Sequence, residues 1–136
     1  MIRFFHALSF ALLTLVAAQA FAAPPDDAKA ALTKAREALV TMLDADAAKY
    51  DALQADITKA TKAVDAALAA AASDKAHADT YKELKKTWDE FKKTRDGEII
   101  PAIKSGKKDA AKALAKGVQA ERFKKLNELL GSLGAK

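Results

Sequence analysis

The chain has 136 residues, a formal net charge of +5 and no cysteine. Without cysteine it can form no disulfide, no zinc–thiolate site and no thioether-linked haem. Acidic residues lie among the lysines, which argues against nucleic acid as a partner and is typical of a solvated surface.

The first 22 residues have the features of an export signal. Arg3 supplies the positive start, residues 4–16 are almost entirely apolar, and an Ala-Phe-Ala sequence ends at Ala22. We therefore expect cleavage after Ala22, a periplasmic location and no stable membrane span in the mature chain. The alternative is an uncleaved anchor, because residues 4–23 have about the length that a spanning helix needs.

The mature chain, residues 23–136, is expected to form a single helical domain. The sequence Pro-Pro-Asp-Asp at 24–27 suits a helix start, because a carboxylate can cap the first turn. From there to Ala72 the apolar residues recur at alternating spacings of three and four. This spacing predicts amphipathic helix throughout the first half of the mature chain.

A boundary is expected inside this first half. A single helix from Asp26 to Ala72 would be about 70 Å long, against about 40 Å for each later helix, so much of it would have nothing to pack on. We therefore predict helices at 26–43 and 46–72, with one continuous helix as the alternative. Asp46 lies on the apolar stripe and offers an N-cap for the second helix.

The third helix is predicted at 74–104, with Ser73 or Asp74 as its cap. Pro101 lies inside this range and should remove one backbone hydrogen bond and kink the helix without ending it. The apolar side of this helix carries Tyr81, Leu84, Trp88, Phe91, Ile99 and Ala102.

A turn at Ser105-Gly106 should lead into a fourth helix at 107–131, which Gly131 and Gly134 end. Four amphipathic helices with short connections predict an all-α fold, the antiparallel up-down-up-down four-helix bundle.

The two predicted helices between Thr80 and Leu133 carry a distinctive set of residues: Trp88, Phe91, Arg95, Ile99, Ile103, Gly106, Ala110, Ala111, Leu114, Gly117, Phe123 and Leu126. This pattern resembles the second half of the four-helix-bundle sensor domain of methyl-accepting chemotaxis proteins. The resemblance implies a free-standing, sensor-like bundle. In such bundles ligands such as carboxylates bind between helices through Arg side chains.

The arginines of the mature chain, Arg36, Arg95 and Arg122, all fall on or beside an apolar helix face. A partly buried guanidinium needs a carboxylate, phosphate or carbonyl partner, because an unpaired buried charge is costly. We therefore expect Arg95 and Arg122, from adjacent helices, to hold a small anionic ligand beside Trp88 and Phe91. Arg36 is a further candidate for this role.

The alternative to a ligand site is a structural role for the same side chains. Each arginine would then pair with Asp46, Glu98 or Glu121 and lay its stem along the core. The aromatic residues of the third helix are in the first place core residues, because helical spacing puts them on one stripe: Tyr81, Trp88 and Phe91.

Catalysis and cofactor binding find no support in the sequence. There is no nucleophile–His–acid set and no glycine-rich phosphate loop. His77 is the only histidine of the mature chain, and without a second His or a Cys it is a weak metal ligand. We therefore expect a non-enzymatic protein without a metal or cofactor.

The sequence thus favours an exported sensor or ligand-binding module whose partner is a small anionic molecule or a helix of another protein. A second hypothesis is a haem-free relative of the cytochrome b562 type of bundle. Met42 could ligate haem there, but residues 107–133 contain no histidine. A third is a structural or chaperone-like interaction protein with an apolar groove between helices. Whether the chain forms a homodimer stays open.

Overall fold

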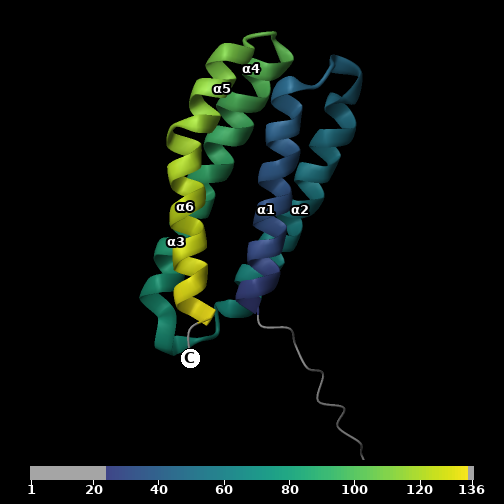
Figure 1. The fold of residues 1–136 in the computed structure, drawn as a ribbon. Coiled ribbons are helices and arrows are strands. Elements are labelled where there is room, and N and C mark those ends of the chain that lie inside the picture. The colour runs from purple at the N-terminus through teal and green to yellow at the C-terminus, as the bar shows by residue number, and fades with distance from the viewer. Residues whose placement is uncertain (1–23, 135–136) are drawn as a thin grey trace, which may run out of the picture.

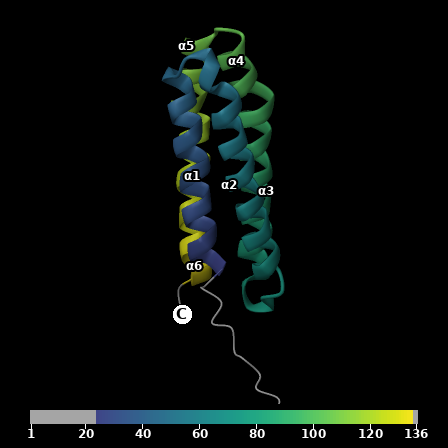
Figure 2. The same ribbon diagram turned by 90° about the vertical axis from the view of Figure 1, so that its right-hand side faces the viewer.

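The computed structural model describes residues 24–134, and the expected export signal with its cleavage site lies outside them. Helices and the short turns between them account for these residues, and no strand occurs among them, so the all-helical prediction is confirmed. The helices form four long segments, which we call the first to fourth arms: residues 24–44, 50–71, 75–104 and 108–134. The arms lie side by side, with turns at alternate ends (Figures 1 and 2). The first arm lies against the second and the fourth, and the third lies against the fourth.

The first two arms are α1 (Pro24–Asp44) and α2 (Tyr50–Ala71), joined through a short 3-10 turn at Ala47–Lys49. The chain therefore reverses at the expected boundary. Asp46 has an extended backbone with φ −76° and ψ 153°, but its side chain makes no capping hydrogen bond. It is also exposed, so its expected place on the apolar stripe is wrong. The reversal takes Asp46 out of the helical period that would have turned it inward.

The third arm begins with a 3-10 turn at Lys75–His77, where Asp74 accepts a hydrogen bond of 3.0 Å from the backbone N–H of Ala76. This bond makes Asp74 the cap that the sequence predicts. α3 (Ala78–Thr94) follows, and then a π-helical turn at Arg95–Ile99 and the short α4 (Ile100–Lys104).

The π-helical turn explains how the third arm accommodates Pro101. The backbone N–H of Ile100 donates to the carbonyl of Arg95, five residues earlier, where an α-helix would use the residue four earlier. Proline has no N–H, and in a regular helix its ring meets the carbonyl four residues back. The wider turn instead places Pro101 in the first turn of α4, where no intrahelical donor is needed.

The predicted turn at Ser105-Gly106 is present and has the hydrogen bonds of a Schellman motif. The N–H of Gly106 donates to Ile103 at 3.0 Å, and the N–H of Lys107 donates to Ala102 at 2.8 Å. Gly106 has a φ of +78°, a conformation that costs little only without a Cβ atom.

The fourth arm is interrupted, and its predicted continuity is wrong. It consists of α5 (Lys108–Lys116) and α6 (Val118–Gly134), with a break at Gly117. The backbone N–H of Gly117 still donates to Ala113 at 2.9 Å, but a Cβ atom at Gly117 would lie only 3.1 Å from that same oxygen. Gly131, expected to end the helix, lies inside α6, because a single glycine weakens a helix without breaking it.

The buried apolar residues form two clusters, one toward each end of the arms. The cluster at the α2–α3 turn contains Ala28, Ala31, Leu32, Val64, Leu68, Leu84, Trp88, Phe91, Leu126 and Leu130. The cluster at the α4–α5 turn contains Leu39, Met42, Leu43, Tyr50, Ile57, Ile99, Ile100, Ile103, Ala111 and Ala115. Burying a large apolar side chain contributes about 1.5–3 kcal/mol, so these clusters supply most of the stabilisation.

Between the two clusters the second, third and fourth arms carry polar residues on their inner faces. We call this level the polar layer and define it by Thr61, Thr94, Arg95 and Gln119. The π-helical turn and the break at Gly117 both lie beside it in the chain. The irregular backbone and the buried polar groups therefore occur at the same level of the fold.

Candidate functional site

Arg95 is the one charged residue of the polar layer, and it is buried. Its side chain is 3% exposed, whereas that of its neighbour Asp96 is 53% exposed. Nε donates to Oδ1 of Asp96 at 2.7 Å and Nη2 donates to Oδ2 at 2.9 Å, so the carboxylate and the guanidinium form a bidentate pair along the Nε–Nη2 edge. Nη1 donates to the hydroxyl of Thr61 on α2 at 2.9 Å.

An open pocket of about 350 Å³ lies beside this guanidinium, between α2 and the π-helical turn. Its lining combines two cationic side chains with hydroxyl and amide groups, and Ile57 and Ile100 form its apolar part. The polar lining residues are Gln54, Thr58, Thr61, Lys62, Arg95 and Asp96. Such a set of donors suits an anion, and the side chain of Asp96 already occupies part of it.

Arg122 has different partners from Arg95. Its Nη1 donates to the hydroxyl of Thr94 at 2.6 Å, and its Nε lies 3.8 Å from a carboxylate oxygen of Glu90. Both partners belong to α3, so this arginine ties α6 to α3, while Arg95 ties the π-helical turn to α2. The hydrogen bonds thus direct the two guanidinium groups, which we expected to share a ligand, to separate neighbours.

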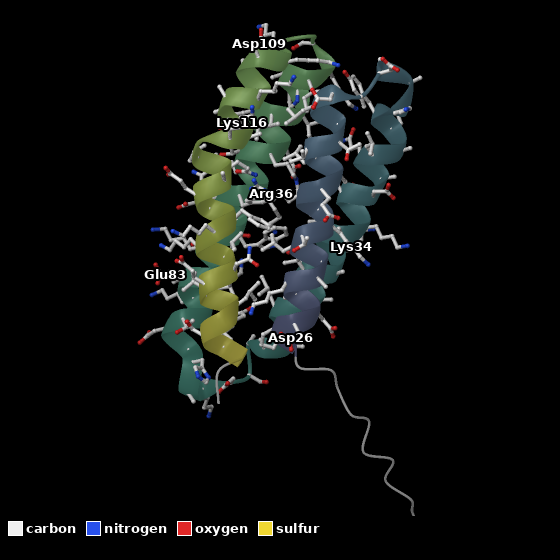
Figure 3. The ribbon with its side chains drawn as sticks, in the orientation of Figure 1. Asp26, Lys34, Arg36, Glu83, Asp109 and Lys116 are labelled. Atoms are coloured by element: carbon white, nitrogen blue, oxygen red, sulfur yellow. The ribbon has the colours of Figure 1, made fainter. Side chains whose placement is uncertain are left out.

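Arg36 lies between α1 and α6 (Figure 3). Its guanidinium carbon is 4.5 Å from the centroid of the Phe123 ring, which is the geometry of a cation–π contact. Among residues 24–134, the carboxylates expected to neutralise the arginines pair with none of them: Asp46, Glu98 and Glu121. Asp96 and Glu90 do so instead.

Trp88 and Phe91 belong to the core, with ring centroids 5.5 Å apart and nearly parallel planes. The indole N–H of Trp88 donates to Asp65 on α2 at 2.7 Å, and Lys92 donates to the same oxygen at 3.1 Å. The guanidinium carbon of Arg95 lies 5.9 Å from the Trp88 ring. Trp88 therefore supports Arg95 from the core side.

Gln119 was missed by the sequence analysis, although it interrupts the apolar stripe of the fourth arm four residues after Ala115. It is 2% exposed. Its Nε2 donates to the backbone carbonyl of Phe91 at 2.9 Å, and its Oε1 has no hydrogen-bond partner within the described part of the chain. A buried acceptor without a partner is rare and costly, which marks this level of the fold as specialised.

His77 lies outside the polar layer, at the start of the third arm. Its Nδ1 is 2.7 Å from a carboxylate oxygen of Asp74. This hydrogen bond, and a second one from the backbone of Ala76, hold the pKa of Asp74 below its ordinary value. Between residues 24 and 134, no group of three or more His, Asp or Glu side chains is placed to hold a metal ion.

None of the helices within residues 24–134 has both the length and the apolar character needed to cross a membrane. Comparisons with protein-family models, with curated proteins and with solved structures find no match to this chain. The residues themselves must therefore carry any statement about function.

Proposed function

We propose that this chain is an exported, antiparallel up-down-up-down four-helix bundle that binds a small anionic molecule, without catalysis. The binding site is the pocket between α2 and the π-helical turn, and Arg95 is its central residue. The single observation that supports this proposal is that the buried guanidinium of Arg95 has, among the described residues, only one carboxylate partner, Asp96, and that this carboxylate is half exposed to solvent.

The energetics of Arg95 favour recognition over a purely structural role. Removing a guanidinium from water costs several kcal/mol, and a well-placed counter-ion offsets this only when the pair is well satisfied. Asp96 is the adjacent residue and faces solvent, so it compensates the charge less well than a buried partner from another helix would. An apolar side chain would pack here at lower cost.

The geometry also provides a route for exchange. Because Asp96 is half exposed, its carboxylate can turn into solvent and leave the Nε and Nη2 edge of Arg95 to a ligand. A carboxylate of the ligand would then occupy the two-pronged edge, which Arg provides and Lys cannot. Lys62 adds positive charge at the same pocket.

Arg122, Trp88 and Phe91 take supporting roles in this proposal. Arg122 holds Thr94, the residue that precedes Arg95, and Trp88 packs beneath the guanidinium. Arg36 is outside the pocket. A sensor role, which the resemblance to chemoreceptor sensor domains implies, is compatible with this site and stays a prediction.

A thermal-shift screen with organic acids and amino acids tests the proposal. A ligand at 100 times its dissociation constant should add about 2.7 kcal/mol to the free energy of unfolding. Arg95→Met should abolish this gain, and Arg95→Lys should reduce it strongly. Arg36→Met is the matched control, because it removes an arginine outside the pocket and should keep the gain. A ligand that stabilises Arg95→Met as fully as the wild type, or no anion that stabilises the wild type, overturns the proposal.

A further inference from the structure

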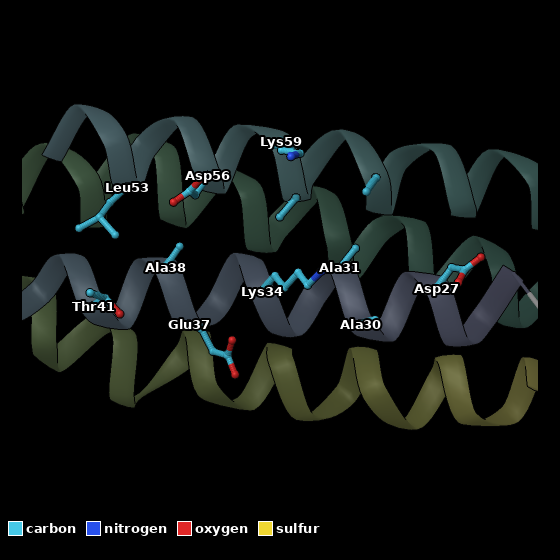
Figure 4. A pocket seen from close by; sticks show the side chains of 12 residues that line it. Asp27, Ala30, Ala31, Lys34, Glu37, Ala38, Thr41, Leu53, Asp56 and Lys59 are labelled. Atoms are coloured by element: carbon cyan, nitrogen blue, oxygen red, sulfur yellow. The ribbon is translucent and has the colours of Figure 1, made fainter. Parts of the chain in front are cut away.

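A second surface, unrelated to the Arg95 pocket, lies along the outer side of the α1–α2 hairpin. It is a groove of about 640 Å³ (Figure 4). Small side chains form much of its floor, namely Ala30, Ala31, Ala38, Ala60 and Ala63. Such a floor allows another helix to approach the two backbones closely, but it does not by itself say what would lie there.

The charged residues of the groove are ordered along its length. Lys34 on α1 and Lys59 on α2 lie at one level, and Glu37 on α1 and Asp56 on α2 lie about one helical turn away (Figure 4). Each helix thus carries one cation and one anion three residues apart, and Asp27 adds a further anion on α1, about two helical turns beyond the lysine level. None of the four side chains at the two levels takes part in an ion pair with another residue between 24 and 134.

We propose that this groove is the interface of a homodimer in which two α1–α2 hairpins pack face to face and antiparallel. A two-fold axis across the groove, midway between the two charged levels, brings the cationic level of one copy onto the anionic level of the other. Lys34 then faces Glu37 of the second copy, and Lys59 faces its Asp56. A second copy of the chain fits because the charge pattern is its own complement under this rotation.

The same pattern excludes other arrangements of two copies. A parallel pairing places lysine against lysine and carboxylate against carboxylate, and like charges across an interface are strongly unfavourable. The small alanine side chains of the groove floor, of which Ala30 and Ala63 are exposed, let the two hairpins come close enough for all four charged contacts of each copy to form together. The inference is independent of the anion proposal, because Arg95 does not line this groove.

Charge reversal tests the interface through the oligomeric state. One variant, Lys34→Glu with Lys59→Glu, makes both charged levels of the groove anionic. The other, Glu37→Lys with Asp56→Lys, makes both levels cationic and leaves Asp27 as the acidic residue of the lining. Sedimentation or light scattering of the mature chain, from about 1 μM to about 1 mM, should show a dimer for the wild type and monomers for each variant. The dimer dissociation constant should rise by about a hundredfold or more in either variant.

The decisive sample is an equimolar mixture of the two variants. Every contact across the groove is then between opposite charges, so the mixture should form a heterodimer that neither variant forms alone. Lys86→Glu with Lys93→Glu is the control, because it makes the same change of net charge on exposed positions of α3 and should leave the dimer intact. Ala63→Trp, at an exposed groove position, should also give a monomer with unchanged helix content.

Two outcomes overturn the inference. One is a wild-type protein that stays monomeric over the whole concentration range. The other is a wild-type dimer that both groove variants retain, which would place the contact elsewhere on the surface.

Discussion

Replacing Arg95 with methionine should change the stability of the fold only slightly, or increase it. A charged residue at 3% exposure would ordinarily be regarded as essential to the fold. Methionine keeps much of the side-chain volume against Trp88 and needs no hydrogen-bond partner. The hydrogen-bond partners of Arg95 stay satisfied after the substitution. Asp96 is 53% exposed and can bind water, and the hydroxyl of Thr61 already donates to the carbonyl of Ile57 at 2.7 Å.

The magnitude follows from these contacts. Exchanging a buried ion pair for well-packed apolar groups is often neutral or stabilising by about 1–4 kcal/mol. The lost hydrogen bond to Thr61 subtracts about 1 kcal/mol. We therefore expect the free energy of unfolding of Arg95→Met to lie between about 1 kcal/mol below and about 3 kcal/mol above the wild type. Asp96→Ala should lower the free energy of unfolding more than Arg95→Met does, because it leaves the guanidinium buried without its carboxylate.

Urea denaturation, followed by far-UV circular dichroism and by the fluorescence of Trp88, measures both variants. Trp88 is the only tryptophan, so its emission reports directly on the core beside the substituted position. A loss of more than about 3 kcal/mol in Arg95→Met, equal to or larger than that of Asp96→Ala, would refute the reasoning. The guanidinium would then have a structural role and would not be available to bind a ligand.

Three other outcomes follow from the backbone and the caps. Gly117→Ala should lower the free energy of unfolding by about 1–3 kcal/mol in urea melts, because the new Cβ atom would lie 3.1 Å from the Ala113 carbonyl oxygen. Gly97→Ala, where a Cβ atom has nothing within 4 Å, should instead raise it by about 0.4–1 kcal/mol, and equal losses at both positions would contradict this account. The lowered pKa of Asp74 means that its cap stabilises the fold above the ordinary value of 3.8 and loses this effect as the pH falls through the lower folded value. Asp74→Asn should therefore be destabilised near neutral pH, and its stability should fall less steeply than that of the wild type on acidification, which melts at a series of pH values would measure.

Local patterns were sufficient for much of the fold. The alternation of three and four apolar spacings placed the buried faces of α1 and α2 correctly, although Val118, expected on the apolar side of the fourth arm, is exposed. Asp74 and Ser105-Gly106 marked helix boundaries that the structure contains. These signals depend only on residues a few positions apart. Pro101 pointed to an irregularity in the third arm, but the π-helical form of that irregularity did not follow from the sequence.

The contacts between arms were less predictable. The break at Gly117 and the bond from Gln119 to the Phe91 carbonyl need two arms in register, and no single segment carries that information. The burial of Arg95 was expected, but its partner was not. Of the acids expected to pair with the arginines, Glu98 lies three residues from Arg95, whereas the partner in the structure is the adjacent Asp96. Consecutive helical residues point about 100° apart, so helical spacing does not predict this pair.

The polar layer has a mechanical consequence for the molecule. The polar layer separates two hydrophobic clusters that share no apolar residue. The helices around one cluster can therefore unfold locally while those around the other stay folded. Native-state hydrogen exchange should therefore divide the backbone amides into two groups with separate opening free energies, one on each side of Gln119 and Thr61. A ligand that binds the helices at the polar layer would couple the two halves into one cooperative unit. Its binding should therefore raise the opening free energies of the amides in both groups.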